Sequence, residues 1–335
     1  MRISAWGVTK KGGKLRPITY RKKIAEGDVL IEVKYCSFSK ADIFFIDNMW
    51  NDTKFPYVPG SEIFGVVVEK GKLVKNVEIG DYVGVGYQVF ACLSCDYCKQ
   101  GKEQFCKKQG LLGVHEYGGL ANNIIVNSNF IYQISTKLRK PEFVSLMCYG
   151  LTAYSAIKNA DLKKISNIGI VGLGNMGHLA VQIADKMGYR VTAFSHSKSK
   201  TPILKKLGIK YIINPNNGDL LEKNSEEYDF ILVTTYYSHD WTKFVKLLKP
   251  EGSLCFIGLP EENISIPPTI LADYARRKIS GSYIGSRKEM HEILELSEKN
   301  DIKAITSVFS LKEIDKVVEL FESNKIPFNV VIKID

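Results

Sequence analysis

The fold is decided by one stretch of the sequence, Ile165-Ser166-Asn167-Ile168-Gly169-Ile170-Val171-Gly172-Leu173-Gly174-Asn175-Met176-Gly177. Residues 165–171 have the apolar pattern of a buried strand, and a helix is predicted from about Asn175 to Met187. The glycines match G-x-G-x-x-G, a pattern that is weak alone but informative between a strand and a helix. They allow a tight turn and let backbone N–H groups approach a pyrophosphate at the helix N-terminus. We therefore predict cofactor binding at Gly172, Leu173, Gly174, Asn175, Met176 and Gly177; the alternative is a glycine turn that only packs helix on strand.

Downstream of this stretch, strands and helices continue to alternate. Strands are predicted at residues 190–194, 211–213, 230–233 and 254–257, and helices at residues 199–207 and 240–248. Repeated alternation of this kind implies a parallel, doubly wound sheet, the Rossmann architecture. Gly258 directly follows the last of these strands and is a further candidate for cofactor binding.

The sequence on either side of this region has a different pattern. In residues 1–130, short β-branched runs such as 29–33, 63–68 and 82–85 alternate with turn residues, which predicts a small barrel-like β domain. After Gly285, two capping boxes open amphipathic helices, Ser286-Arg287-Lys288-Glu289 and Ser310-Leu311-Lys312-Glu313. A final strand is predicted at residues 328–334.

Length and composition indicate a globular protein with two cores. The chain has 335 residues, which is long for one core, and its 45% hydrophobic and 24% charged residues are ordinary for a globular protein. No apolar run is long enough for a membrane helix, and residues 1–7 lack the apolar core of a signal peptide. We expect a cytoplasmic protein that does not bind membranes.

The formal net charge of +10 raises the question of nucleic-acid binding. The lysines are scattered along the whole chain, and no run of basic residues is interleaved with aromatic ones. A solvated basic surface that attracts anionic cofactors is the better interpretation. We expect no nucleic-acid partner.

The end of the second strand of the alternating region indicates which cofactor binds. The acidic residue that holds the ribose 2′-hydroxyl of NAD, expected about 20 residues after the glycines, is missing. The strand ends instead in Phe194-Ser195-His196-Ser197-Lys198-Ser199-Lys200, whose hydroxyls and cations suit a 2′-phosphate. We predict NADP(H); the alternative is an exposed helix cap followed by solvated lysines.

Four of the seven cysteines are closely spaced: Cys92, Cys95, Cys98 and Cys106. An odd number of cysteines in a long chain without a signal peptide argues against a disulfide framework. Four closely spaced thiolates are what a closed tetrahedral zinc site requires, so we predict one structural zinc. An iron–sulfur cluster is the alternative, but Cys106 is followed by Lys107 rather than by proline.

These two motifs, in this order, resemble the medium-chain dehydrogenases, and most closely the cinnamyl alcohol dehydrogenase branch of zinc-dependent alcohol dehydrogenases. Val58-Pro59-Gly60-Ser61-Glu62 is similar to the family's V-P-G-H-E. The resemblance covers nearly the full length and also rests on Gly118-Gly119 and on residues 80–86, 150–155, 172–178, 195–200 and 281–285.

The resemblance implies an α/β protein with two domains. A GroES-like β-barrel catalytic domain would comprise residues 1–147 and 286–335, and an NADP-binding Rossmann domain residues 148–285. A homodimer formed through the Rossmann edge and a small-molecule carbonyl substrate are also implied. The implied NADP contacts come from Thr152, Ser195, Ser197 and Lys200.

The sequence departs from the family pattern where the catalytic zinc is expected. In place of the family's C-H-T/S-D-x-H stands Ser39-Lys40-Ala41-Asp42-Ile43-Phe44. By this resemblance, Ser39 and Ser61 replace two zinc ligands, and Ala41 and Phe44 replace the proton-relay hydroxyl and histidine. Glu62 and Asp42 remain, as does Cys148 at the third ligand position. Because serine is a poor zinc ligand beside thiolate and imidazole, we expect the catalytic zinc to be absent.

Without that zinc, reduction of a simple carbonyl would be slower by orders of magnitude. Hydride addition to a conjugated enal, enone or quinone is less demanding, since a hydrogen-bond donor can stabilise the enolate. The candidate catalytic groups are Lys40, Glu62, His115 and Tyr149, with the hydroxyls of Ser39 and Ser61 as further donors. The alternatives are a phosphate contact for Lys40, a structural hydrogen bond for Glu62 and an ordinary loop position for His115. An aromatic pocket is predicted from Phe44, Trp50, Tyr87, Tyr149 and Tyr283.

Three functions are compatible with these residues. The first is a zinc-independent NADPH reductase of conjugated carbonyls. The second is an alcohol dehydrogenase or aldehyde reductase with an altered metal site built from Cys148, Glu62, Asp42 and His115. The third is an NADPH-binding protein with little catalysis.

Overall fold

The computed structural model describes residues 1–196, 201–207, 209, 211–217, 223, 225–260, 262–272, 275–323, 325 and 328–334. The chain forms two compact units. Unit 1 comprises Met1–Cys148, Ser286–Glu298 and Lys303–Asp335, and unit 2 comprises Tyr149–Gly285 and Lys299–Ile302.

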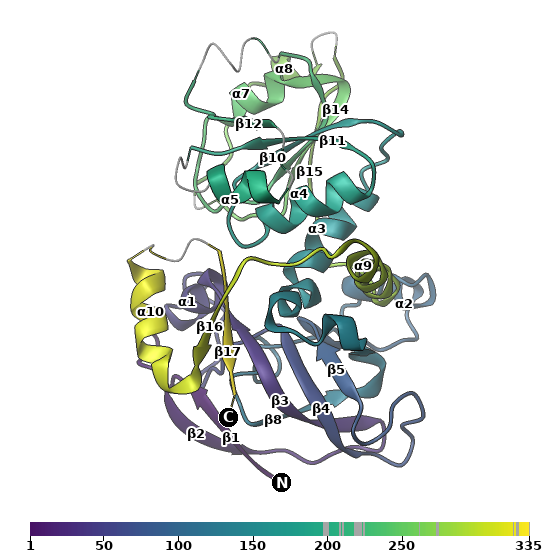
Figure 1. Cartoon of the computed structure of the whole chain (residues 1–335), viewed down its shortest axis with the longest axis vertical. Coiled ribbons are helices and arrows are strands. Elements are labelled where there is room, and N and C mark those ends of the chain that lie inside the picture. The colour runs from purple at the N-terminus through teal and green to yellow at the C-terminus, as the bar shows by residue number, and fades with distance from the viewer. Residues whose placement is uncertain are drawn as a thin grey trace. The chain divides into compact units, whose positions relative to one another are not determined.

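Unit 2 is built on a parallel six-stranded sheet (Figure 1). Its order is β12 (Tyr211–Ile213), β11 (Arg190–Phe194), β10 (Asn167–Val171), β13 (Tyr228–Val233), β14 (Leu248–Phe256) and β15 (Lys278–Gly281). The chain first runs outward from β10 to β12 and then from β13 to β15, so the winding direction reverses beside β10. The predicted doubly wound parallel sheet is confirmed, and this reversal is the place where such sheets bind ligands.

Helices cover both faces of this sheet. They are α3 (Tyr149–Lys158), α4 (Gly177–Lys186), α5 (Thr201–Lys206), α7 (Trp241–Lys246) and α8 (Pro268–Ala272). Ile168 and Ile170 on β10 and Ile231 on β13 are fully buried, as expected for strands covered on both sides. The helix predicted at residues 240–248 ends earlier, because Leu248 already pairs with Tyr228 as the first residue of β14.

Unit 1 contains the predicted barrel-like β domain. Its main sheet has the order β16 (Thr306–Ser310), β17 (Asn329–Lys333), β3 (Asp28–Phe38), β4 (Ile63–Lys70), β5 (Tyr82–Val85) and β9 (Ile131–Gln133), and β8 (Asn123–Asn127) also pairs with β3. Two small sheets accompany it, β1 (Arg2–Gly7) with β2 (Arg16–Arg21) and β6 (Gln88–Phe90) with β7 (Gly110–Leu111). Alternating side chains of β3 and β4, such as Ile31, Val33 and Val67, form the core.

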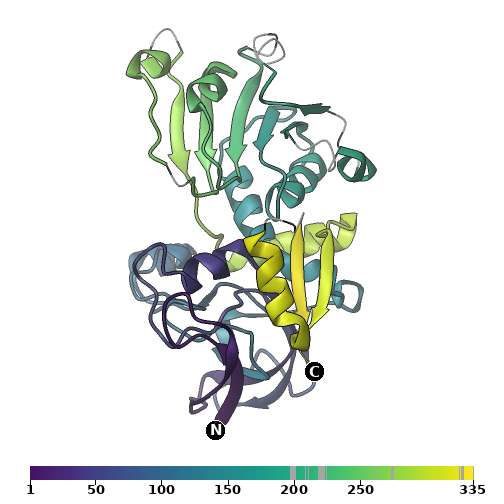
Figure 2. The ribbon, with the colours of Figure 1, turned by 90° about the vertical axis from the view of Figure 1, so that its left-hand side faces the viewer.

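The C-terminal segment completes unit 1. Val330 of β17 pairs with Phe38 of β3, and Figures 1 and 2 both show the yellow C-terminal strands beside one another at this sheet. Helix α9 (Arg287–Asn300) precedes these strands in the chain, and helix α10 (Ile314–Glu322) comes between them. Both capping boxes form: the Ser286 N–H donates to Glu289 at 2.7 Å, and the Ser310 N–H donates to Glu313 at 3.0 Å. No described helix is both long and apolar enough to cross a membrane.

Candidate functional site

The glycine turn after β10 can be made only by glycine. Gly172 has a φ of +88°, and a Cβ there would lie 2.8 Å from the Cβ of Thr235. A Cβ on Gly177 would lie 1.9 Å from the Gly172 carbonyl oxygen, to which Thr234 Oγ1 donates at 2.8 Å. These contacts close the turn against the end of β13 and place the first residue of α4 directly beside it.

Gly174 has the opposite environment. A Cβ added to Gly174 would meet no atom within 4 Å, so its backbone faces open space at the start of α4. Leu173 and Met176 are buried beneath it, and the His178 ring Nδ1 lies 2.7 Å from the Gly174 carbonyl oxygen. The turn is therefore held from within while its outer side is accessible, which is the arrangement that a pyrophosphate needs.

The other predicted cofactor residues of unit 2 differ in their surroundings. The Ser195 N–H donates to the Ile213 carbonyl at 2.9 Å, which holds Ser195 at the carboxyl end of β11. A Cβ on Gly258 would lie 2.3 Å from the Thr235 carbonyl oxygen, so this glycine packs against the segment that also closes the Gly172 turn. Thr152 is buried on α3. Ser197 and Lys200 lie outside the described residues.

The four clustered cysteines converge on one point in unit 1. The ligand atoms of Cys92, Cys95, Cys98 and Cys106 all lie within 4.8 Å of one another. Sγ of Cys92 is 4.0 Å from that of Cys98 and 3.5 Å from that of Cys106. Zn–S bonds of about 2.3 Å in a tetrahedron require sulfur atoms somewhat less than 4 Å apart, so the donor set fits a closed zinc site.

The backbone around these cysteines directs N–H groups at the sulfur atoms. The Cys95 N–H donates to Cys92 Sγ and the Cys92 N–H donates to Cys106 Sγ, each at 3.4 Å. Hydrogen bonds from Ser94 and Cys95 lower the pKa of the Cys92 thiol to about 5, while burial raises that of Cys98 to about 12. Leu93 takes a φ of +52°, an unusual conformation that lets its own N–H reach Cys98. Such N–H donors favour thiolates, the form that binds zinc.

The segment from Cys92 to Cys106, which we call the cysteine lobe, is tied to the C-terminal segment by the buried acid Glu103. Glu103 lies three residues before Cys106, and its Oε1 is 3.6 Å from the guanidinium of Arg287, the first residue of α9. The same guanidinium lies 5.5 Å from the centre of the Phe130 ring. Glu103 thereby joins the lobe to a helix that follows it by almost 200 residues.

Ser39, which the resemblance places at a zinc-ligand position, takes part in a hydrogen-bond network. Asp42 is buried at the start of α1 (Lys40–Ile46), and its Oδ2 accepts from the N–H of Ser39 at 2.8 Å and from its hydroxyl at 2.9 Å. Its Oδ1 accepts from the Tyr57 hydroxyl at 3.0 Å and from the Gly60 N–H at 2.9 Å. The Ser39 hydroxyl is therefore engaged with a carboxylate.

Burial raises the pKa of Asp42 above its ordinary value, and the hydrogen bonds from Gly60, Ser39 and Tyr57 counteract that rise only in part. The neighbouring thiol of Cys36 is fully buried, and burial together with the charges of Asp42 and Glu62 raises its pKa well above the usual range. Cys36 is thus a neutral core thiol. Gly60, with a φ of +98°, leaves room for it, since a Cβ there would lie 2.2 Å from Cys36 Sγ.

The remaining family ligand positions do not assemble with other donors into a second cluster. Glu62 is buried and Cys148 is half-buried. Throughout the described ranges, the four cysteines are the one group of three or more histidine, cysteine or acidic side chains whose ligand atoms lie within 4.8 Å of one another.

The predicted proton donors of unit 1 are Lys40 and His115, which contact groups other than Asp42. Lys40 places its ammonium 5.6 Å from the Phe44 ring centre. His115 is exposed, and its Nδ1 accepts from the Leu111 N–H at 3.3 Å, which leaves the proton of the neutral ring on Nε2. Tyr149 belongs to unit 2, where it is buried as the first residue of α3.

An aromatic cluster surrounds α1. Trp50 packs edge-on against Phe44 and Phe45, with ring centres 5.5 and 4.9 Å apart, and Phe45 stacks on Tyr57 at 5.5 Å. Phe44 and Trp50 were predicted from the sequence, whereas Phe45 and Tyr57 were not. The presence of a tyrosine directly before Val58-Pro59-Gly60 was the available signal.

Comparison with known proteins agrees with this architecture. Residues 25–136 match the alcohol dehydrogenase GroES-like domain, and residues 176–299 match the zinc-binding dehydrogenase domain. The chain is 33% identical to cinnamyl alcohol dehydrogenase 2 of Rauvolfia serpentina, over 98% of this chain and 94% of that protein. It is 29% identical to the aldehyde reductase AdhA of Synechocystis, over 98% of both.

Solved structures of related proteins have the same fold as this chain. A cinnamyl alcohol dehydrogenase of Sorghum bicolor superposes with a TM-score of 0.94 at 27% identity, covering 99% of this chain and 98% of that one. The CAD protein of Helicobacter pylori complexed with NADP(H) superposes with a TM-score of 0.91 at 30% identity, with the same coverage.

Proposed function

The chain belongs to the zinc-binding alcohol dehydrogenase family with a GroES-like domain, in its cinnamyl-alcohol-dehydrogenase-like branch, and we propose that it is an NADPH-dependent reductase of conjugated carbonyl compounds that works without a catalytic zinc. That the protein is an oxidoreductase of this family follows from its relatives. The cofactor preference, the missing zinc and the substrate class are the proposed parts.

The proposed cofactor is NADP(H). Gly174 leaves the space that a pyrophosphate requires, and β11 is followed by Ser195 and the exposed His196 rather than by an acid. Without a carboxylate there, no group competes with a 2′-phosphate. A relative in complex with NADP(H) supports the same choice.

The absence of a catalytic zinc rests mainly on the Asp42 network. Four donors already converge on this buried carboxylate, two of them from Ser39, the residue at a family ligand position. A metal at Ser39 would have to break these hydrogen bonds and would gain only a weak hydroxyl ligand. The single observation that carries the proposal is the 2.9 Å hydrogen bond from the Ser39 hydroxyl to Asp42.

Conjugate reduction suits such a site. NADPH, when bound, supplies a hydride, and the β-carbon of an enal or enone accepts it while charge moves onto the carbonyl oxygen. The protein has to hold that oxygen with hydrogen-bond donors, and a proton from solvent or from Glu62 then adds to the α-carbon to give the saturated carbonyl compound. Because the Ser39 hydroxyl already donates to Asp42, the proposed donors are Ser61, Lys40, Tyr149 and His115, and Glu62 is the proposed acid. Phe44 and Trp50 would flank the substrate.

Product analysis with cinnamaldehyde and NADPH tests this function. We expect the saturated aldehyde as the main product, insensitive to a chelator. Unsaturated alcohol as the main product, lost on chelation, would establish a zinc-dependent aldehyde reductase instead, the alternative favoured by the names of the relatives. No turnover of enals, aldehydes or quinones would leave the third function, an NADPH-binding protein.

A homodimer through unit 2 is also proposed. β15 is the edge strand of the parallel sheet, and all four of its residues are exposed. An exposed edge presents unpaired backbone groups that a second copy can pair with. Light scattering should give twice the mass of the chain. The Ser282 N–H donates to Phe256 of β14, so the Ile279 N–H faces the free edge, and Ile279→Pro, which removes it, should lower the mass to that of the monomer.

A further inference from the structure

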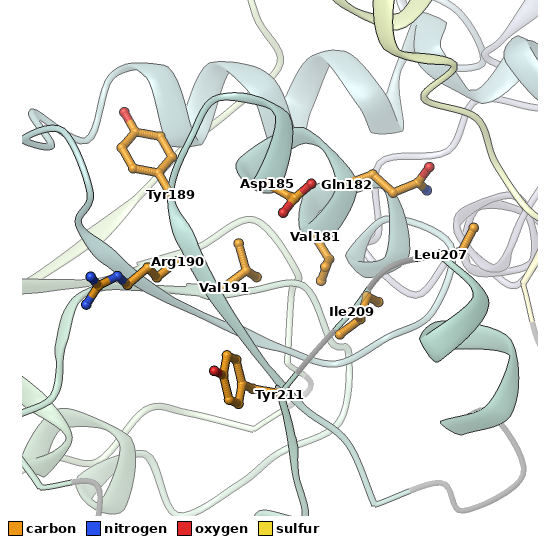
Figure 3. Close-up of a pocket in the computed structure, with 9 residues that line it drawn as sticks. All are labelled: Val181, Gln182, Asp185, Tyr189, Arg190, Val191, Leu207, Ile209 and Tyr211. Carbon is orange, nitrogen blue, oxygen red and sulfur yellow. The ribbon is translucent and has the colours of Figure 1, made fainter.

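A cavity in unit 2 is distinct from the glycine turn. It has a volume of about 270 Å³ and lies between the second half of α4, the start of β11 and the residues Leu207, Ile209 and Tyr211 (Figure 3). Since β11 and β12 run parallel to β10, their first residues Arg190 and Tyr211 lie at the amino edge of the sheet. Gly172 follows the carboxyl end of β10, about 16 Å away along a five-residue strand. The cavity is therefore not part of the dinucleotide site.

The floor of the cavity is apolar. Val181 of α4 and Ile209 are buried, and Val191 of β11 and Leu207 are half-buried. In Figure 3, Val181 and Val191 point into the same space from the helix and from the strand. β11 lies inside the sheet, between β10 and β12, yet Val191 keeps exposed surface because the cavity opens over it. A flat apolar group placed there would remove this surface from water.

The rim of the cavity carries hydrogen-bond donors that the protein does not use. The Arg190 N–H donates to the Ser166 carbonyl at 3.0 Å and fixes the backbone. Its guanidinium is exposed, and among the described residues no carboxylate forms an ion pair with it. The hydroxyls of Tyr189 and Tyr211 likewise make no hydrogen bond within the described part of the chain, and Tyr211 is 63% exposed.

The charge at the rim favours an anion. Asp185 also lines the cavity, but its carboxylate pairs with Lys186 at 2.9 Å. Within the described ranges the charge of Arg190 is thus left without a counterpart, in a protein whose formal net charge is +10. Guanidinium binds carboxylates through two parallel hydrogen bonds, and phenol hydroxyls can donate to the same oxygens.

We propose that this cavity binds a small flat carboxylate, an aromatic or conjugated acid, with its ring on Val181, Val191 and Ile209 and its carboxylate at Arg190. A volume of about 270 Å³ accommodates one ring with a short substituent. The site stands independently of the proposed reductase function, since it shares no residue with the glycine turn or the Asp42 network.

Calorimetric titration of the full chain, in the presence of NADP⁺, tests the site with benzoate as the probe. Benzyl alcohol keeps the ring without the charge, and acetate keeps the charge without the ring. We expect benzoate to bind at one site per chain, roughly tenfold or more tightly than either. Arg190→Gln should reduce benzoate affinity to that of benzyl alcohol, whereas Arg2→Gln, an exposed arginine of unit 1, should change nothing.

A second variant tests the floor of the cavity. Val181→Phe fills the space without changing charge and should abolish binding of both ring compounds. Equal benzoate affinity in the wild-type, Arg190→Gln and Val181→Phe proteins would place the ligand elsewhere and overturn the proposal. Absence of benzoate binding to the wild-type protein would overturn it as well. Because Arg190→Gln changes only an exposed side chain, its result stands even where Val181→Phe unfolds the unit.

Discussion

The hydroxyl of Tyr57 donates a 3.0 Å hydrogen bond to Oδ1 of Asp42, joining the segment before Gly60 to the first turn of α1. Both side chains are buried, with 2% and 4% of their surface exposed. The Ser39 hydroxyl binds the other oxygen of the same carboxylate. One acid therefore organises the region where the family's metal would bind.

Tyr57→Phe should destabilise the protein by about 1–3 kcal/mol, because it removes a buried donor to an acidic group and leaves the acceptor underpaired. Urea unfolding, followed by tryptophan fluorescence, measures the effect. The matched control is Tyr237→Phe, since Tyr237 is 61% exposed. Its free energy of unfolding should stay within about 0.5 kcal/mol of that of the wild type. Equal stability of the two variants would show that the hydrogen bond contributes nothing.

Asp42→Asn should change how stability depends on pH. Burial raises the pKa of Asp42 above 3.8, so the folded state holds the proton more tightly than the unfolded chain does. The stability contributed by this group is therefore fully present below pH 3.8 and is lost as pH rises through the folded-state pKa. The free energy of unfolding of Asp42→Asn, relative to wild type, should rise as the pH increases above 3.8. A difference that falls over this range would mean that the hydrogen bonds outweigh burial.

Zinc analysis should find about one tightly bound zinc per chain. Cys106→Ser should lose it, because Cys106 Sγ lies within 4.8 Å of the other three thiols. Cys148→Ser should keep it, because Cys148 belongs to no such group among the described residues. Elemental analysis after dialysis decides the matter: two zinc ions in the wild type, one of them lost in Cys148→Ser, would contradict the zinc-free catalytic site.

Gly174→Ala should weaken cofactor binding and leave the stability of the fold nearly unchanged. The new methyl group meets no protein atom within 4 Å, so stability should change by no more than about 1 kcal/mol. It would occupy the space at the start of α4, and the NADPH dissociation constant should rise about tenfold or more. Gly177→Ala is the contrasting variant, since its methyl group would lie 1.9 Å from the Gly172 oxygen and should disrupt folding. Unchanged NADPH affinity in Gly174→Ala, measured by fluorescence titration, would refute a pyrophosphate at this turn.

Ser195→Asp should reverse the cofactor preference. An acid at the end of β11 would repel a 2′-phosphate and accept a hydrogen bond from a free ribose hydroxyl. We expect weaker NADPH binding and tighter NADH binding than in the wild type, with both dissociation constants measured at one ionic strength. Wild-type protein that binds the two cofactors equally would remove the basis for this prediction.

Local features of this fold and the doubly wound sheet could be predicted from the sequence, whereas particular contacts between distant segments could not. The glycine turn and the cysteine lobe each involve residues close together in the chain, so spacing alone indicates their geometry. The hydrogen bond between Tyr57 and Asp42 depends on how two separate segments pack, which no pattern reveals. β15 was missed because its residues are all exposed and lack an apolar pattern. The cavity at Arg190 likewise depends on tertiary packing of α4 against β11.

The pairing of β17 with β3 has a consequence for how the protein is made. Phe38 and Val330 are partners in one sheet, but the whole of unit 2 lies between them in the chain. A ribosome that has synthesised β3 must complete the parallel sheet of unit 2 before it reaches β17. The side of β3 that awaits β17 stays unpaired during that time, and strand edges of this kind are prone to aggregate. Unit 2 can therefore fold during translation, whereas unit 1 closes only once its last strand has emerged.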